Sequence, residues 1–125
     1  GKDQPQPIYV QKNDLLKKDV LFEKFNSLDF LIGQIVSVRK IKKKNLLSFK
    51  VDVKNDVLNI ISREDYKIDL QKIIGQKVAV LANIKPFKID GHITRGIILL
   101  AKDKKGNSSF IFPDDLEVET GSKIH

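Results

Sequence analysis

Residues 30–53 decide the fold, and they read FLIGQIVSVRKIKKKNLLSFKVDV. From Phe30 to Val38 the pattern has a period of two, which is typical of a β-strand. Residues 46–53 alternate in the same way, so we expect a second strand that returns beside the first. Gly33 lies near the start of the first strand, where a bulge or a tight bend is common.

Short apolar runs separated by turn residues continue along the chain. They predict further strands at residues 57–61, 77–82, 96–101 and 110–112. The run 96–101 is almost wholly apolar, so we expect that strand to be buried on both faces. Residues 70–74 have helical spacing and precede Gly75, which predicts one short helix between the third and fourth strands.

About five short strands with one helix in this position are the order of an OB-fold, a partly open Greek-key barrel. The sequence therefore predicts an all-β fold with one short helix, namely a five-stranded OB-fold barrel with N- and C-terminal extensions. A two-sheet sandwich of similar length is the alternative. The chain has 125 residues, which fits one domain. We assign residues 1–19 to a linker or extension and residues 20–125 to the OB-fold domain.

Positive charge is concentrated in the predicted barrel. The chain carries a formal net charge of +7. Residues 34–105 hold 17 Lys and Arg against 7 Asp and Glu, whereas the flanks hold 6 basic and 9 acidic residues. A basic barrel between weakly acidic flanks favours a polyanionic partner.

Several function classes are disfavoured by composition. The absence of cysteine excludes disulfides, thiol catalysis and Cys-based zinc sites, and it fits a cytoplasmic location. No apolar run approaches the roughly 20 residues that a membrane helix needs, so we expect no membrane partner. His92 and His125 have no neighbouring residues that suggest a triad or a metal site, and the seven glycines form no phosphate loop. We therefore expect no catalytic residue, no metal and no cofactor.

Two basic segments are the candidate binding sites. The first, residues 39–44, has five basic residues in six positions between two paired strands, where an OB-fold presents a loop to nucleic acid. The second, residues 83–96, combines basic residues suited to phosphates with side chains that hydrogen-bond sugars or bases. The candidates are Arg39, Lys40, Lys42, Lys43, Lys44, Asn83, Lys85, Lys88, Thr94 and Arg95. Phe87 is the one good candidate for an exposed stacking ring, so phosphate and shape recognition fits better than stacking along a single strand.

Five stretches together resemble the tRNA-binding domain family. They are DFLIG with Ile35 and Val38 (29–38), Leu46 with KVD (46–52), IIS (60–62), GQKVAVLANIKP (75–86), and Gly91 with TRGIIL (91–99). The resemblance runs from about Val20 to Ile124, and ANIKP (82–86) followed by Gly91 and Gly96 is its most specific part. It is strongest to the C-terminal tRNA-binding domain of bacterial methionyl-tRNA synthetases. The Pro-containing polar start then resembles the linker to a synthetase body in cis.

The resemblance implies that this module binds the outer corner of folded tRNA by shape and is not itself catalytic. The parent chain would be a methionine–tRNA ligase. The family's tRNA-binding Asn, Lys, Ser and Met correspond here to Asn83, Lys85, Thr94 and Ile97. Thr94 keeps the hydroxyl of the usual Ser, while Ile97 loses the flexible contact of the usual Met.

The resemblance also implies a homodimer built by the terminal extensions. The corresponding contact residues are Val20, Leu21, Phe22, Phe110 and Phe112. An apolar flank of this kind, together with the acidic C-terminal segment, also fits a second hypothesis, a free-standing dimeric tRNA-binding or chaperone-like protein-binding OB-fold. An enzyme is the third and least supported class.

The chain departs from the family pattern at several positions. Phe87 and Asp90 stand where basic residues are common, and Arg63 stands where Gly is usual. The family's Pro-x-Ala-Asp-Lys-Leu hairpin is replaced by KKKNL (42–46), with one residue fewer. We infer that positive charge has moved from the long loop to the first hairpin.

Overall fold

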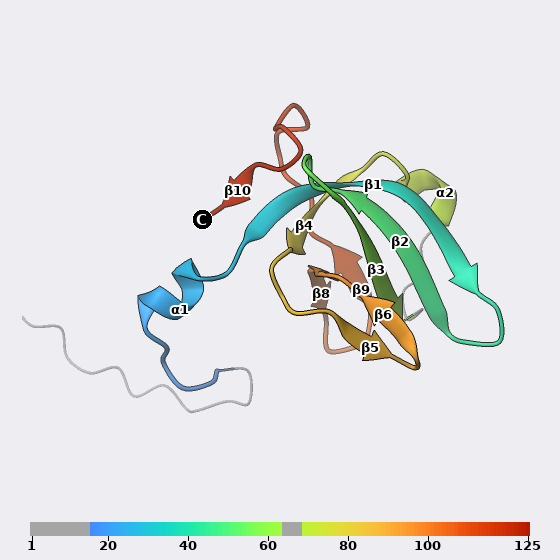
Figure 1. Ribbon diagram of the computed structural model, residues 1–125, viewed down its shortest axis with the longest axis horizontal. Helices are drawn as coiled ribbons and strands as arrows, with labels where there is room; N and C mark the ends of the chain where they lie inside the picture. The colour runs from blue at the N-terminus through green and yellow to red at the C-terminus, as the bar shows by residue number, and fades with distance from the viewer. Residues whose placement is uncertain (1–15, 64–68) are drawn as a thin grey trace, which may run out of the picture.

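A computed structural model describes residues 16–63 and 69–125. Its main sheet has the strand order β3-β2-β1-β4-β7, with β10 added to β1 (Figure 1). The bounds are β1 Phe30–Ile41, β2 Leu46–Asp52, β3 Val57–Arg63, β4 Lys77–Leu81, β7 Ile97–Ile98 and β10 Lys123–Ile124. The helix α2, Leu70–Ile73, lies between β3 and β4 as predicted. The predicted OB-fold is thus confirmed.

Alternation along β2 builds the barrel core. Leu47, Phe49 and Val51 are fully buried inside, and the residues between them belong to the outer face of the sheet. β2 pairs antiparallel with β1 on one side and with β3 on the other, and only the register with β3 is continuous. The barrel closes where the Arg95 N–H donates to the Asn59 carbonyl at 2.9 Å.

The curvature of β1 comes from two features. Its register with β2 shifts between Ile35 and Ser37, so the bulge falls there and not at Gly33 as the sequence suggested. Gly33 instead permits close packing, because a Cβ at this position would lie 2.5 Å from Val51 Cγ1 and 2.9 Å from Val80 Cγ2. β1 can therefore lie deep in the barrel and pair with both β2 and β4.

The long connection before β7 contains a hairpin that we had not predicted. Its strands are β5, Phe87–Ile89, and β6, His92–Thr94. The turn residues Asp90 and Gly91 both have positive φ, 47° and 84°, as the common two-residue hairpin turn requires. The Asp-Gly pair is the sequence signal that could have revealed this hairpin.

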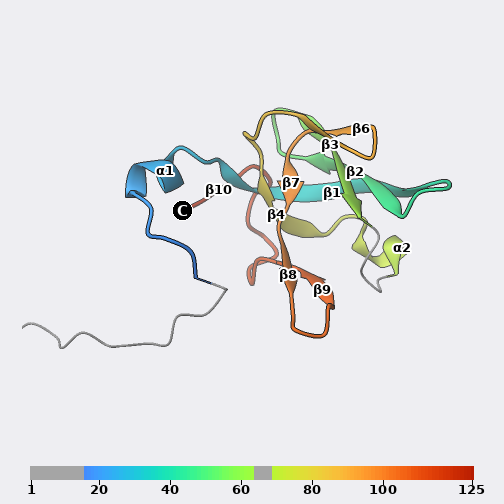
Figure 2. The ribbon, with the colours of Figure 1, turned by 90° about the horizontal axis from the view of Figure 1, so that it is seen from below.

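The apolar run 96–101 does not form one doubly buried strand. It divides into β7, which pairs with β4, and β8 (Leu100–Lys102), which pairs with β9 (Ser108–Phe110). The strand is interrupted because the chain changes its pairing partner. The Leu99 N–H still donates to the Ala79 carbonyl of β4, whereas the residues from Leu100 onward pair with β9. The last strand predicted at 110–112 is likewise displaced to β9. Figure 2 shows the β8–β9 hairpin projecting away from the barrel on the side opposite β6.

The helix α1 and the strand β10 extend the barrel at the start of β1. The helix α1, Phe22–Asn26, precedes this strand, and β10 pairs with Phe30 and Leu31 (Figure 1). α1 lies inside the segment assigned to the domain, while most of the predicted linker, residues 1–15, lies outside the described residues. No helix in the described part of the chain is long and apolar enough to cross a membrane.

Candidate nucleic-acid interface

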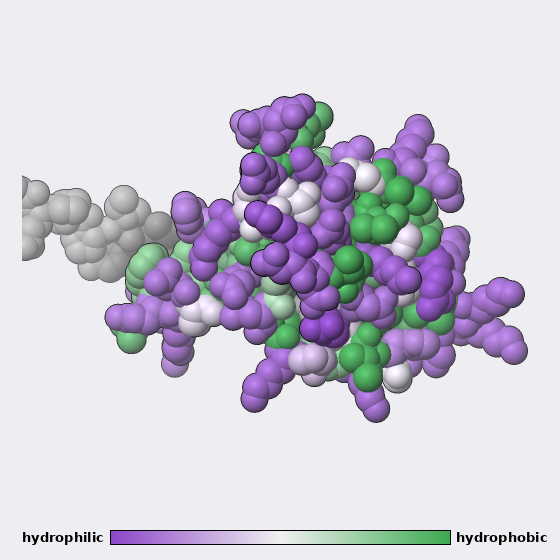
Figure 3. All heavy atoms as spheres, turned by 45° about the horizontal axis from the view of Figure 1, so that its top comes forward, coloured by the Kyte–Doolittle hydropathy of each residue, from purple (hydrophilic) through white to green (hydrophobic). Residues whose placement is uncertain are grey.

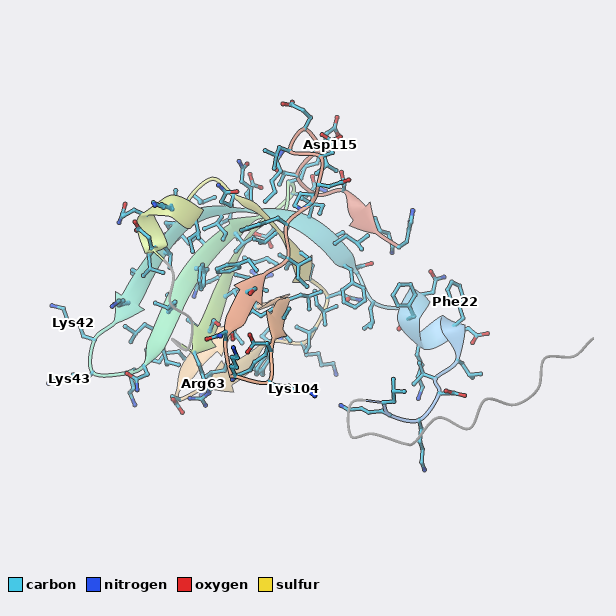
Figure 4. All side chains as sticks on the ribbon, turned by 180° about the vertical axis from the view of Figure 1, so that it is seen from behind. Phe22, Lys42, Lys43, Arg63, Lys104 and Asp115 are labelled. Carbon is cyan, nitrogen blue, oxygen red and sulfur yellow. The ribbon has the colours of Figure 1, made fainter. Side chains whose placement is uncertain are left out.

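The tip of the β1–β2 hairpin presents three lysines to solvent. Lys42, Lys43 and Lys44 are exposed, and Lys43 turns the chain with a φ of 64°. The flanking Ile41 and Leu46 pair with each other and are buried. Figure 4 shows Lys42 and Lys43 extending from the end of the molecule farthest from Phe22. The tip therefore concentrates charge on a rigid stem.

A small apolar cluster joins this tip to the second basic segment. Ile41, Leu46 and Ile61 form a buried group on the outer face of the sheet, and Ile89 of β5 packs against it. Lys88, the neighbour of Ile89, is exposed. The two basic segments, separated by some forty residues in sequence, are therefore held next to each other on the folded chain.

An ion pair joins the same elements. Arg63 Nη1 donates to Asp90 Oδ2 at 3.2 Å, linking the end of β3 to the β5–β6 turn. Both side chains are substantially exposed, so the pair contributes at most about 1 kcal/mol. Burial of one Ile or Leu side chain contributes about 1.5–3 kcal/mol. The apolar cluster is thus the principal anchor of the hairpin.

The remaining basic candidates surround this area. Lys85 is exposed before β5, and Arg39 and Lys40 are exposed on β1. Arg95 is also exposed, but its Nη2 donates to Asp56 Oδ2 at 3.3 Å. Its positive charge is therefore partly offset in the free protein.

Thr94 differs from the others because its side chain is 1% exposed. Its hydroxyl oxygen accepts a hydrogen bond from the Ile61 N–H at 2.9 Å and donates to the Gly96 carbonyl at 3.1 Å. A buried hydroxyl with both partners in the barrel cannot reach an external ligand. Ile97 is half-buried beside Leu81 of β4. The side chain of Thr94 therefore positions β6 against β3, and the sequence alone did not reveal this.

Asn83 is exposed, but both ends of its amide are occupied. Its Oδ1 accepts from the Asp29 N–H at 2.7 Å, and its Nδ2 donates to the Ser27 carbonyl at 2.8 Å. The residue thereby fastens the segment between α1 and β1 to the end of β4. A helix of five residues needs such tertiary support, because isolated helices this short are unstable in water.

Sequence reasoning missed a polar groove beside the basic surface. It has a volume of about 250 Å³ and lies across β1, β2 and β3. Its lining residues are Ser37, Val38, Arg39, Ser48, Lys50 and Asn59. Only Arg39 had been selected, although the alternation of β2 already predicts that Ser48 and Lys50 share a face. A further basic segment, residues 102–105, spans the end of β8 and the start of the turn to β9, and Figure 4 labels Lys104 in it.

The predicted dimer residues divide into two groups. Val20, Leu21 and Phe22 are 66–70% exposed, and Phe112 is 50% exposed. The prediction of a dimer contact was wrong for Phe110, because this residue is buried in the barrel core with its ring centroid 6.2 Å from that of Phe49. Further exposed apolar residues that the sequence analysis did not select include Phe25, Leu28, Ile111 and Leu116. Figure 3 shows apolar side chains at the α1 end and further apolar patches over the barrel, separated by hydrophilic side chains.

Among residues 16–63 and 69–125, no group of three or more His, Asp or Glu side chains is arranged to hold a metal ion. His92 is half-buried within β6, and His125 is exposed at the last position. The exposed side chains of the two basic segments are mainly cations and hydrogen-bond donors.

Curated proteins similar to this chain are methionine–tRNA ligases. The enzyme of Christiangramia forsetii is 34% identical over 92% of this chain and 17% of its own length. That of Archaeoglobus fulgidus is 36% identical over 86% of this chain and 16% of its own length. The chain thus spans about a sixth of the length of these curated relatives.

Solved structures support the same assignment. The "MetRS related protein" of Pyrococcus horikoshii superimposes with a TM-score of 0.77 at 25% identity, covering 87% of this chain and all of that one. The chaperone CsaA of Bacillus anthracis has a TM-score of 0.75 at 19% identity, covering 86% of this chain and all of that one, and so shares the fold. The family described as "Putative tRNA binding domain" matches residues 30–123. On this match, the chain belongs to the tRNA-binding domain family.

Proposed function

We propose that the chain binds folded tRNA through one continuous basic surface. The surface comprises the hairpin-tip lysines Lys42, Lys43 and Lys44 together with Arg39, Lys40, Lys85, Lys88 and Arg95. The observation that carries the proposal is the apolar cluster of Ile41, Leu46 and Ile61 with Ile89, because it holds the two basic segments together. Lysines suit phosphates as point charges, and a rigid arrangement of them selects the shape of a folded backbone.

Recognition by phosphate contact and shape fits this surface better than stacking on bases. Phe87 is 38% exposed at the start of β5, whereas Phe49 and Phe110 belong to the core. A track of exposed rings, which sequence-tolerant single-strand binding requires, is therefore missing from the described part of this surface. Ile97 is half-buried and would add an apolar contact.

We assign Thr94 and Asn83 positioning roles in this interface. The Thr94 hydroxyl accepts a hydrogen bond from the Ile61 N–H of β3. The Asn83 amide accepts one from the Asp29 N–H and donates one to the Ser27 carbonyl. Asn83 is exposed and its carbonyl oxygen can accept a second hydrogen bond, so tRNA can still approach it.

The small share of its longer relatives that the chain covers suggests how tRNA binding would be used. As the C-terminal appendix of a cytoplasmic methionine–tRNA ligase, the module would hold tRNA close to the catalytic body. A weak contact in cis raises the effective concentration of tRNA without altering the chemistry of the ligase.

The exposed apolar residues near α1 suggest a homodimer. Val20, Leu21 and Phe22 would pack against their copies, together with Phe112. Such a dimer would present two basic surfaces. Sedimentation of the chain with residues 1–22 removed tests the idea, because an unchanged mass in solution would place the contact elsewhere.

Gel-shift titration tests tRNA recognition itself. The ligands are bulk folded tRNA, heat-denatured tRNA and single-stranded RNA, each at two salt concentrations. We expect the tightest binding to folded tRNA and weaker binding at the higher salt concentration. Equal binding of all three would contradict shape recognition, while binding of unfolded peptide and not of tRNA would favour the chaperone-like hypothesis.

A further inference from the structure

The strand β6 runs along β3 and closes the barrel there (Figure 1, Figure 2). The Thr94 hydroxyl accepts a hydrogen bond from the Ile61 N–H, and the Arg95 N–H donates to the Asn59 carbonyl. We call this line of contact the seam. It borders the proposed tRNA-binding surface, because Arg95 belongs to that surface and Lys88 lies on β5, the strand that pairs with β6.

An ion pair lies at each end of the seam. At the end of β3, Arg63 Nη1 donates to Asp90 Oδ2 at 3.2 Å. Just before the start of β3, Asp56 Oδ2 accepts from Arg95 Nη2 at 3.3 Å. All four side chains are between 43% and 64% exposed. A phosphate can therefore reach both guanidinium groups, but it must compete with a carboxylate at each of them.

The lysines of the hairpin tip have no such competitor. Lys42, Lys43 and Lys44 form no ion pair with any residue in the ranges 16–63 and 69–125. A folded RNA presents its phosphates at fixed positions, so it can dock on these free cations without following the seam. A flexible single strand can bring a phosphate to any exposed cation along a basic path, so the seam arginines would add to its binding if they were free.

We propose that Asp56 and Asp90 make the surface selective, by keeping Arg95 and Arg63 paired and so less available to single-stranded RNA. The two carboxylates offset the guanidinium charges and repel a strand that follows the seam. Specificity often needs such an unfavourable element against the wrong ligand as well as favourable contacts with the right one. Folded tRNA loses less, because its principal contacts are the unpaired lysines of the tip. The inference rests on the proposed function, since it concerns which RNA the same surface rejects.

The test compares the wild-type chain with a seam variant that carries Asp56→Asn and Asp90→Asn. Asparagine at position 56 keeps an oxygen to accept the Val57 N–H, which Asp56 Oδ1 accepts at 2.8 Å. The β2–β3 turn should therefore stay folded, and urea unfolding verifies this. Fluorescence anisotropy measures binding of folded tRNA and of oligouridylate, a single strand without stable secondary structure, over a range of salt concentrations.

The matched control carries Asp114→Asn and Asp115→Asn, which remove the same charge from the C-terminal segment. Both residues are exposed, and neither forms an ion pair with a described residue. Figure 4 shows Asp115 well away from Arg63, with the barrel between them in this view. The control therefore measures the effect of net charge alone.

We expect the seam variant to bind oligouridylate about fivefold more tightly than the wild-type chain. Its log–log salt slope should be steeper by about 1.4, the value for two added phosphate contacts on a single strand. Folded tRNA should respond to the seam variant no more than to the control. Adding Arg63→Gln and Arg95→Gln should abolish the gain for oligouridylate, whereas adding Lys17→Gln and Lys18→Gln, which restore the same net charge, should leave most of it.

The outcomes separate this inference from the proposed function. An equal gain for folded tRNA and oligouridylate, or a gain no larger than in the control, would overturn the role of the two carboxylates. If the wild-type chain prefers folded tRNA and the seam variant keeps the whole preference, the inference fails and the proposed function stands. If the seam variant gains oligouridylate binding through its arginines but the wild-type chain does not bind folded tRNA, the pairing of the arginines is supported and the proposed function fails.

Discussion

Arg63 Nη1 donates a hydrogen bond to Asp90 Oδ2 at 3.2 Å, which joins the last residue of β3 to the turn of the β5–β6 hairpin. The resemblance to the tRNA-binding domain family led us to expect Gly at the first position and a basic residue at the second. In this chain the two departures are partners. The positive charge of Arg63 at the end of β3 thus offsets the negative charge of Asp90 in the hairpin turn.

A double-mutant cycle tests how strongly this pair couples the two elements. Because both side chains are largely exposed, we expect Arg63→Ala and Asp90→Ala to show a coupling energy of about 0.2–1 kcal/mol in urea unfolding. Ile89→Ala should destabilise the chain more than either change, since Ile89 packs on the apolar cluster. A coupling of several kcal/mol would show that the ion pair, and not the cluster, anchors the hairpin.

Asn83 is predicted to anchor the N-terminal extension through the Asp29 N–H. Asn83→Ala removes the acceptor, so hydrogen exchange at the Asp29 amide should accelerate. We expect a loss of about 1 kcal/mol in the free energy of unfolding, because the released groups lie at the surface and can bond to water. Asn83→Asp keeps an acceptor and should preserve the protection of Asp29. Unchanged exchange in the Ala variant would contradict the anchoring role.

Gly33 is predicted to be required for close packing of the barrel. Gly33→Ala brings a methyl group into the space of Val51 and Val80, and overpacking of this kind costs about 1–3 kcal/mol. The cost should fall in a Val51→Ala background, where the nearest clashing methyl group is absent. An equal cost in both backgrounds, measured by urea unfolding, would mean that packing against Val51 does not cause the destabilisation.

The Asp103 carboxylate organises the β8–β9 turn by accepting hydrogen bonds from Lys105 and Asn107. The backbone N–H of Asn107, and then its side chain and the N–H groups of Lys105 and Gly106, hold the pKa of the Asp103 carboxyl below its ordinary value. Because the pKa of Asp103 is lower in the folded state than in the unfolded state, these hydrogen bonds stabilise the fold at pH values above the unfolded-state pKa. This stabilisation is lost as the pH falls through the folded-state pKa.

A carbon-13 titration of the Asp103 carboxyl measures this effect. We expect its midpoint below the ordinary value for Asp, and Asn107→Gly should shift it upward because the side-chain donor is removed. A midpoint at or above the ordinary value in the wild-type chain would contradict the turn geometry.

The long strands and the position of the helix could be predicted from sequence because their signals are local. Apolar and polar residues alternate over seven or more residues in both β1 and β2. Such a pattern identifies the element as a strand and shows which of its faces is buried. The prediction of one strand over residues 96–101 was wrong because a uniformly apolar segment does not show where the strand that it pairs with changes. The bulge between Ile35 and Ser37 depends on packing against β2, and Gly33 offered a more conspicuous but incorrect position for it.

The binding surface was predictable in its charges but not in its geometry. Lys42 to Lys44 stand out as a run, whereas their proximity to Lys88 depends on contacts of Ile89 across the fold. Composition could not show that the Thr94 hydroxyl is buried, nor that the Asn83 amide is engaged, since both depend on backbone groups distant in sequence. Asn59 was missed because one Asn in a strand gives no signal until its neighbours on the sheet are known.

The salt dependence of tRNA binding tests the central proposal most directly. The variant carries Lys42→Ala, Lys43→Ala and Lys44→Ala at the hairpin tip. The matched control replaces Lys17, Lys18 and Lys24, three exposed lysines in or just before α1, whose first residue Phe22 lies at the end of the molecule opposite the tip (Figure 4). Both variants lose the same net charge, so they differ only in where it is removed.

The account predicts that the tip variant binds folded tRNA more weakly, with a log–log salt slope reduced by about 2–3 from the loss of three phosphate contacts. The control variant should keep nearly the wild-type slope. A slope unchanged in the tip variant, or reduced equally in both, would contradict a tRNA interface centred on the β1–β2 hairpin.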